Sequence, residues 1–194
     1  MMKKIKIKKK EDNAFKKIWD FLWNSNSILS WIIDFILIFL LVKFVIFPLF
    51  GLMLGTSLPF VIIESGSMEH QGNFDAWFGL HGGWYLDKNI SKETVYSWDF
   101  NNGLDMGDIV VVKGNKNQDY EIGDIIIFSV PKQPTPIIHR IIGKTEHYYS
   151  TKGDHNDGQN YYEGMVFKEQ VIGKAALRVP KLGWFKLFLY GKFN

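Results

Sequence analysis

A long apolar run constrains this chain more than any other feature. Residues 35–58 hold a single charge, Lys43, in a stretch longer than the roughly 20 residues that cross the core of a bilayer. Lys43 must therefore snorkel or face a protein partner. A cleaved secretory signal would have an apolar core of only about 7–15 residues. We expect a retained transmembrane helix over residues 28–58, with Pro48 and Gly51 as points where it can kink.

The charge distribution predicts the orientation of that helix. Residues 1–27 contain eight lysines and three acidic residues, a net charge of +5, whereas the whole chain carries only +3. A lysine block before a long apolar run is more typical of an amino terminus that stays in the cytoplasm than of nucleic-acid binding. The apolar residues of this basic tail indicate either an amphipathic helix on the membrane surface or a solvated tail: Phe15, Ile18, Trp19, Leu22 and Trp23.

The remainder of the sequence predicts a mostly β domain outside the membrane. Short segments rich in β-branched residues recur between Gly, Asp, Pro and Asn, and none has a clear helical period. We expect this domain at residues 59–180, followed by an apolar tail at 181–194 that is too short to span a membrane and touches its surface. The expected strands lie at residues 60–65, 108–114, 124–130, 136–143, 147–153 and 170–177.

One segment interrupts the strand pattern. Residues 70–106 combine aromatic residues with glycines and polar residues, which indicates an insertion between strands. Aromatic rings with polar edges favour the headgroup region of a bilayer, and they also pack with one another. The sequence leaves open whether the insertion rests on the bilayer, covers a cleft or forms a satellite core.

A serine follows the end of the apolar run. In the stretch VIIESGSMEH, Gly66 permits a sharp turn that presents Ser67 at a strand end. A serine nucleophile needs a base, and His139 lies in the apolar strand segment PIIHRIIG. Asp154 and Asp157, in the loop TKGDHNDGQN, are candidates to orient that imidazole. Each residue alone also fits a plain structural role, such as a core histidine bonded to a carbonyl or an Asx turn.

Composition argues against other chemistries. The chain has no cysteine, which excludes disulfides, thiolate catalysis and cysteine-ligated zinc. Glu69, His70, Asp75 and His81 have no spacing typical of metal ligands. We therefore expect neither a metal nor a cofactor.

In order along the chain, five motifs resemble the boxes of type I signal peptidases: SGSM after a membrane anchor, GDIVVVKG, GDIIIFSVP, IIHRIIG and TKGDHND. The resemblance runs over about residues 61–177, interrupted by the insertion. Bacterial members carry a lysine where this chain has His139, so the chain is similar to the archaeal and endoplasmic-reticulum branch, which uses serine, histidine and aspartate. The resemblance implies a signal-peptidase-like β domain.

The resemblance also implies roles for individual residues. Ser67 would be the nucleophile and His139 the general base, while the hydroxyl of Ser65 would assist the backbone N–H of Ser67 in the oxyanion hole. Family members carry a second aspartate about six positions after the first, where this chain has an asparagine. A shortened loop would align Asp157 with it, so we predict that Asp157 partners His139 and that Asp154 is structural or supporting.

The predicted function is removal of signal peptides from exported preproteins by a serine endopeptidase at the outer face of the cell membrane. Its partners would be preproteins, the bilayer and the export translocon, with no nucleic acid. The histidine branch and the short chain favour an archaeal source. The alternatives are a non-catalytic homologue that binds exported chains and a regulatory membrane protease with one dedicated substrate. A histidine base acts only when neutral, so activity should fall at acidic pH.

Overall fold

The computed structural model describes residues 14–25 and 27–189 of the chain. The chain divides into two compact units, Met1–Pro48 and Leu49–Asn194. The lysine block at residues 1–10 and the chain end at 190–194 lie outside the described residues.

The amino-terminal unit is helical. Helix α1 (Ala14–Asn24) is followed by helix α2 (Ile28–Leu41), and the Ser27 hydroxyl caps α2 by accepting a hydrogen bond from the Ser30 N–H at 3.1 Å. The buried hydroxyl of Ser30 donates to the carbonyl of Phe21 at 2.9 Å and so ties the two helices together. A helix is thus present before the apolar run, and its contact with a membrane stays a prediction.

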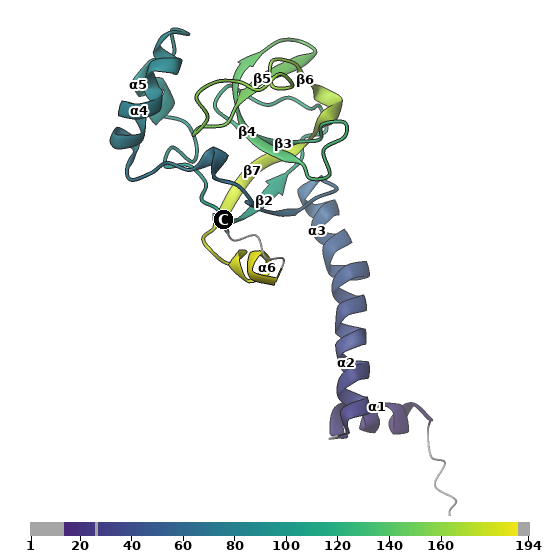
Figure 1. The fold of residues 1–194 in the computed structure, drawn as a ribbon. Coiled ribbons are helices and arrows are strands. Elements are labelled where there is room, and N and C mark those ends of the chain that lie inside the picture. The colour runs from purple at the N-terminus through teal and green to yellow at the C-terminus, as the bar shows by residue number, and fades with distance from the viewer. Residues whose placement is uncertain (1–13, 26, 190–194) are drawn as a thin grey trace, which may run out of the picture. The chain divides into compact units, whose positions relative to one another are not determined.

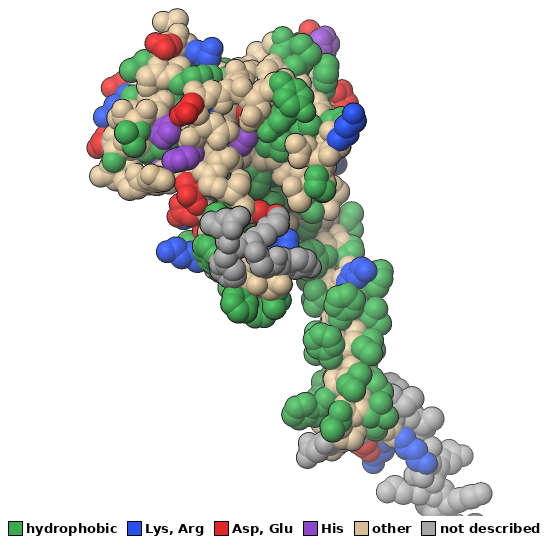
Figure 2. All heavy atoms as spheres, in the orientation of Figure 1, with side chains coloured by type: hydrophobic (Ala, Val, Ile, Leu, Met, Phe, Trp, Pro, Cys, Tyr) green, Lys and Arg blue, Asp and Glu red, His purple; other side chains and the backbone are tan. Residues whose placement is uncertain are grey.

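Within the described residues, one helix is long and apolar enough to cross a membrane. It runs over Ile28–Leu54 with a mean hydropathy of 2.7, in agreement with the predicted N-terminal apolar helix. Its apolar side chains are exposed and form the green surface along the helix in Figure 2. The ammonium of Lys43 lies 5.8 and 5.3 Å from the ring centres of Phe39 and Phe44, so aromatic rings accompany this charge.

The apolar helix changes its hydrogen bonding before Pro48. A π-helical turn, η1 (Val42–Ile46), lies between α2 and helix α3 (Phe47–Leu54). Pro48 has no N–H to donate and its ring crowds the preceding turn, so a widened turn accommodates it without ending the helix. Gly55, with a φ of 64°, follows the last helical residue in the left-handed conformation that glycine adopts most readily.

In the described part of the larger unit, seven antiparallel strands form the core, which confirms the mostly β prediction. The strand order is β1-β2-β7-β3-β4-β5-β6, and Figure 1 shows that the sheet is curled. Six strands overlap the predicted segments; β6, of two residues, was not predicted. The strands are β1 (Phe60–Ile62), β2 (Ile109–Lys113), β3 (Ile125–Phe128), β4 (Ile137–Lys144), β5 (Tyr148–Lys152), β6 (Val166–Phe167) and β7 (Val171–Val179), with a 3-10 turn η3 (Lys168–Gln170) between the last two.

The central strand β3 is buried on both faces of the sheet. Ile125 and Ile127 pack into one hydrophobic cluster, whereas Ile126 and Phe128 pack into another. Because successive side chains of a strand point to opposite faces, both faces are covered at this strand. This double burial explains why the segment DIIIF is continuously apolar rather than alternating.

The insertion at residues 70–106 is helical, which corrects the expectation that no helix follows the apolar run. Helix α4 (Phe74–Leu86) is capped by Asn73, and helix α5 (Lys92–Tyr96) by Ser91. Glycines and apolar residues lie all round α4, so its sequence shows no helical period. The satellite core, one of the alternatives, is present and is built from Phe74, Trp77, Phe78, Tyr85 and Val95, while contact of the insertion with a bilayer stays a prediction.

Helix α6 (Trp184–Leu189) ends the described chain. Its Leu187 is buried, and the N–H of Gly183 donates to the carbonyl of Gly107 at 2.8 Å, which holds α6 to the sheet domain. Hydrophobic side chains gather on this helix in Figure 2. The exposed ones are Trp184, Phe185, Phe188 and Leu189, and Leu182 just before the helix is exposed as well.

Replacing Ile127 by alanine should lower the free energy of unfolding by about 2–5 kcal/mol, because a fully buried side chain is lost and a cavity remains. Ile122→Ala is the matched control; its side chain is 46% exposed and should cost less than about 1 kcal/mol. Urea unfolding of the full chain in detergent, followed by tryptophan fluorescence, measures both. Equal losses would contradict the placement of Ile127 in the core.

Candidate active site

The second serine of the motif SGSM lies in a tight turn. The 3-10 turn η2 (Gly66–Met68) follows strand β1, so Ser67 leaves the sheet and is half-buried. The carbonyl of Met68 accepts a hydrogen bond from the N–H of Leu104, and the carbonyl of Ser67 accepts one from the N–H of His155, both at 2.9 Å. The turn is therefore held by the end of the insertion and by the loop after β5.

The imidazole of His139 lies beside this serine. Its Nε2 is 3.1 Å from the Oγ of Ser67. The His139 side chain is only 4% exposed, because β4 carries it into the covered part of the sheet opposite Ile126 of β3. The Oγ of Ser65 is 3.3 Å from the Oγ of Ser67, and Ser65 is exposed. The fold thus brings together three of the residues singled out from the sequence.

A glutamate that the sequence analysis did not consider contacts the other nitrogen of His139. Nδ1 of His139 is hydrogen-bonded to Oε1 of Glu163, whose side chain is fully buried. Oε2 of Glu163 accepts hydrogen bonds from the backbone N–H of Asn160 at 2.6 Å and from its side-chain amide at 2.9 Å. Both carboxylate oxygens are therefore used, and the imidazole is oriented from its Nδ1 side.

The structure places Glu163, and not the predicted Asp157, beside the imidazole of His139. Asp157 is exposed and is not among the hydrogen-bond partners of His139 in the described part of the chain. The reason is the return path of the loop. The N–H of Thr151 on β5 donates to the carbonyl of Glu163 at 2.9 Å, so the chain regains the sheet only at Glu163.

No local pattern marks Glu163 in the sequence. It follows two tyrosines in the segment NYYEGM, beyond the loop that carries the aspartates. One signal could have indicated it: the imidazole needs an acidic partner, and the position expected to supply an aspartate holds an asparagine. Asn160 stands where an aspartate was expected and cannot supply a charge, and the next acidic residue after Asp157 is Glu163.

Asp154 forms a buried ion pair with Arg140. The guanidinium donates to both carboxylate oxygens at distances of 2.7 to 3.2 Å, and neither side chain is more than 1% exposed. Burial alone would raise the pKa of Asp154, but the charge of Arg140 and hydrogen bonds from His70 and Arg140 hold it well below its usual range. Arg140 follows His139 on β4, so the two side chains point to opposite faces of the sheet.

Gly153 lets the loop after β5 approach the serine and the imidazole. A Cβ at this position would lie 2.8 Å from Nε2 of His139, 2.8 Å from the carbonyl oxygen of Ser67 and 2.6 Å from the side-chain nitrogen of Asn156. These separations are shorter than van der Waals contact, so only glycine fits without moving its neighbours.

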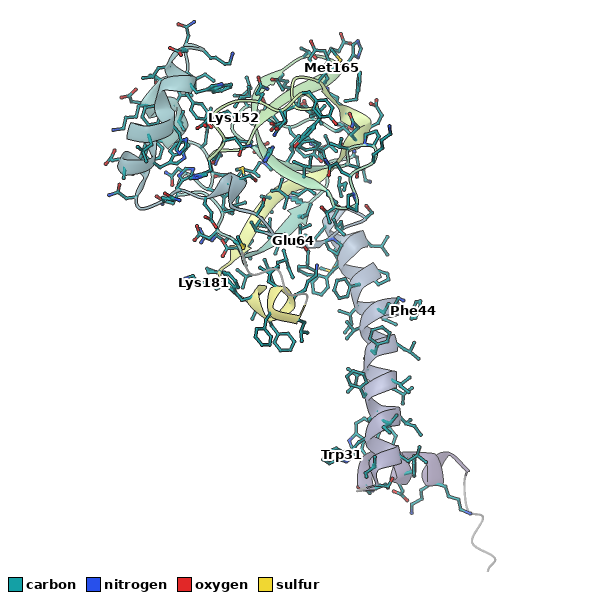
Figure 3. The ribbon with its side chains drawn as sticks, in the orientation of Figure 1. Trp31, Phe44, Glu64, Lys152, Met165 and Lys181 are labelled. Carbon is teal, nitrogen blue, oxygen red and sulfur yellow. The ribbon has the colours of Figure 1, made fainter. Side chains whose placement is uncertain are left out.

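Lys152, the last residue of β5, is buried, and its side chain faces the helical insertion; it is labelled in Figure 3. Its ammonium donates to the carbonyl of Gly153 at 3.0 Å and lies 5.1 Å from the ring centres of both Trp84 and Tyr85. Burial lowers the pKa of Lys152 to about 8, against the opposing effect of nearby carboxylates.

The side chains considered as metal ligands have other partners. Within residues 14–25 and 27–189, no three histidine or carboxylate groups are placed so as to hold a metal ion. Glu69 accepts a hydrogen bond from the N–H of Met106, His70 bonds Asp154, Asp75 pairs with Lys92, and the ring of His81 lies 4.9 Å from that of His155.

The arrangement of hydroxyl, imidazole and carboxylate suits acyl transfer. The imidazole of His139 can accept the hydroxyl proton of Ser67, and the carboxylate of Glu163 can stabilise the imidazolium that results.

Comparison with known proteins identifies relatives that are all described as catalytic subunits of the signal peptidase complex. The chain is 30% identical over 127 residues to the "Signal peptidase complex catalytic subunit sec11" of Pyrenophora teres f. teres, an alignment covering 60% of this chain and 72% of that protein. The proteins of the same description from Leptosphaeria maculans and Scheffersomyces stipitis are 28% and 24% identical, over 60% and 75% of this chain and 72% and 74% of their own lengths. No model of a protein family matches the chain. These fungal relatives give no support to the expected archaeal source.

Gly153→Ala should leave the protein folded but separate Ser67 from His139, because the added methyl overlaps both Nε2 of His139 and the Ser67 carbonyl. The rate of Ser67 labelling by a fluorophosphonate probe should fall by about 100-fold or more, since such chemistry depends on sub-ångström alignment. Gly158→Ala is the control, because a Cβ there meets nothing within 4 Å. Equal labelling of both variants would refute the close approach of this loop.

Lys152→Met should remove a pH dependence of stability. The lysine has a pKa of 10.5 in the unfolded chain and about 8 in the folded one, so the unfolded state binds more protons between these values and stability rises with pH there. Between about pH 8 and pH 10 the wild type should gain about 2 kcal/mol relative to the variant. Urea unfolding at each pH measures the difference. Parallel curves would show that the ammonium is not held in this environment.

Proposed function

This chain belongs to the family of signal peptidase complex catalytic subunits, and from that membership we propose that it is a membrane-bound serine endopeptidase that removes signal peptides from exported preproteins. The observation that carries the proposal is the chain of contacts from Ser67 through His139 to Glu163. A nucleophile, a base and an orienting carboxylate in this order are the groups with which serine–histidine–carboxylate peptidases cleave a peptide bond.

In the proposed mechanism, Oγ of Ser67 attacks the carbonyl carbon of the scissile bond while Nε2 of His139 takes the hydroxyl proton. The tetrahedral intermediate collapses when His139 returns that proton to the leaving amine, which leaves an acyl ester on Ser67. A water molecule, deprotonated by His139, then attacks the ester carbonyl; the carboxylic acid of the cleaved signal peptide leaves, and His139 returns the proton to Oγ of Ser67. The backbone N–H of Ser67 and the hydroxyl of Ser65 are the proposed oxyanion donors.

Glu163 takes the role that the sequence had suggested for Asp157. Its carboxylate contacts Nδ1 of His139 and would hold the tautomer whose Nε2 faces Ser67. Asn160 donates two hydrogen bonds to the other carboxylate oxygen, from its backbone N–H and its side-chain amide, and would thereby keep the glutamate in place. Asp154, whose carboxylate is paired with Arg140, would act on the site through its loop.

The sheet offers a path for an extended substrate. Among the described strands, β1 is the end strand of the sheet and pairs only with β2. Residues 137–139 of β4 pair with β3, whereas pairing of β4 with β5 begins only at Arg140. The segment before the scissile bond would add to these free edges by β-augmentation and place small side chains in shallow apolar pockets. Such pockets discriminate by about 1–3 kcal/mol per methylene, so the position of the bond relative to the bilayer would add selectivity.

Membrane attachment is part of the proposal. The apolar helix Ile28–Leu54 would span the bilayer with the lysine-rich terminus in the cytoplasm and the sheet domain on the outer face. The exposed apolar side chains of α6 would touch the lipid surface. Preproteins and the export translocon are the proposed partners.

The test is cleavage of a model preprotein by the full chain in reconstituted membranes, with the new amino terminus of the product sequenced. Ser67→Ala and His139→Ala should abolish cleavage, and Glu163→Gln should slow it by about 100-fold or more, because a neutral amide does not stabilise the imidazolium. Asp157→Asn is the matched control and should stay within about twofold of wild type, since removal of an exposed charge has little effect.

The outcomes separate the alternatives. A wild type that binds preprotein without cleaving it would indicate a non-catalytic homologue. Cleavage of one substrate and no other signal peptide would indicate a dedicated regulatory protease. Activity lost in Asp157→Asn and kept in Glu163→Gln would restore Asp157 as the partner of His139.

A further inference from the structure

We propose that the helical insertion positions the catalytic loop: three of its side chains, His70, Trp77 and Tyr85, hold Asp154 and thereby align Ser67 with His139. This inference rests on the proposed function, and it gives the insertion a task in catalysis beyond forming a satellite core.

The three insertion side chains converge on one residue of the loop after β5. Nε2 of His70 lies 3.0 Å from Oδ2 of Asp154, and the hydroxyl of Tyr85 donates to Oδ1 at 3.3 Å. The indole N–H of Trp77 donates to the backbone carbonyl of Asp154 at 3.2 Å. All three side chains are at most 6% exposed, so these hydrogen bonds are made away from water, where donor placement matters most.

The orientation of His70 is set within the insertion itself. Its ring stacks on the indole of Trp77 with centroids 3.7 Å apart and planes 4° from parallel. Nδ1 of His70 is buried without a hydrogen-bond partner among the described residues, so the polar contact of the ring is made through Nε2. The stack therefore aims one N–H at the carboxylate of Asp154.

The neighbours of Asp154 in the loop contact the reacting groups. The N–H of His155 donates to the carbonyl of Ser67 at 2.9 Å. Gly153 lies so close to His139 that an added Cβ would be 2.8 Å from its Nε2. A shift of Asp154 would therefore move both the His155 N–H that binds the serine turn and Gly153, which packs against the imidazole. Misplacement of reacting groups by an ångström can lower a catalytic rate about 100-fold.

A second contact joins the insertion to the same loop. The ammonium of Lys152 lies over the rings of Trp84 and Tyr85 at 5.1 Å and donates to the Gly153 carbonyl. Helix α4 thus contacts the chain on both sides of Gly153. Arg140 of β4 binds the carboxylate of Asp154, and the insertion side chains bind this carboxylate and also the Asp154 backbone carbonyl. The insertion therefore holds the backbone of Asp154 as well as its side chain.

The experiment compares His70→Ala, His70→Gln and Val95→Ala in the full chain, reconstituted with a model preprotein. We expect His70→Ala to lower kcat and the rate of fluorophosphonate labelling of Ser67 by about tenfold, with KM within about twofold. His70→Gln should recover most of the rate, because the glutamine amide can donate to Asp154 from a similar position. Val95→Ala is the matched control: this side chain is buried in the insertion core, so the variant should lose stability but keep kcat.

A readout that does not depend on activity is amide hydrogen exchange of His155, whose N–H is bonded to the Ser67 carbonyl. Exchange should be at least about tenfold faster in His70→Ala and unchanged in Val95→Ala. If His70→Ala does not fold, Tyr85→Phe, which removes only the hydroxyl donor, should give a smaller effect of the same kind.

The proposal and its premise fail in different ways. A wild type that neither cleaves the preprotein nor is labelled at Ser67 would refute the proposed function. An active wild type in which His70→Ala and Val95→Ala have the same kcat, labelling rate and His155 exchange would refute the positioning role alone.

Discussion

The buried ion pair between Arg140 and Asp154 is the interaction on which the rest of the site depends. Removing two charges from water is costly, so such a pair is stable only when its remaining donors and acceptors are satisfied. Here the guanidinium also donates to three backbone carbonyls, those of Asp99, Phe100 and Gly123. The pair therefore joins strand β4, the end of the insertion and the loop after β5 at one point. A shift of any of these segments would leave a buried charge without its partners, which is costly.

Strand alternation explains how one strand serves both the ion pair and the chemistry. His139 and Arg140 are neighbours on β4 and point to opposite faces, yet both are buried because the serine turn covers one side chain and the insertion the other. In a sheet with one solvated face, one of these residues would be exposed. The helical insertion thus allows a histidine and an arginine to stand side by side in a covered strand.

The carboxylate that orients His139 shows how tertiary structure can move a functional group along the chain. What the imidazole requires is a buried acceptor at Nδ1, and any loop residue that reaches this point can supply it. The loop after β5 returns to the sheet at Glu163, and Asn160 donates a hydrogen bond to the second carboxylate oxygen of this glutamate. The longer side chain of a glutamate then reaches the imidazole from a position that no aspartate of the loop occupies.

The sequence by itself determined the apolar helix, the positions of six strands, the family resemblance and the pairing of a serine with a histidine, because hydropathy, β-branched runs and short motifs are local signals. The helices of the insertion were not predicted, because α4 carries apolar residues and glycines on its exposed face as well as on its buried one, so its sequence shows no hydrophobic period. Only the tertiary structure decided which carboxylate meets His139 and what surrounds Asp154. Those contacts join residues far apart in the chain, and they depend on where a curled sheet returns each loop.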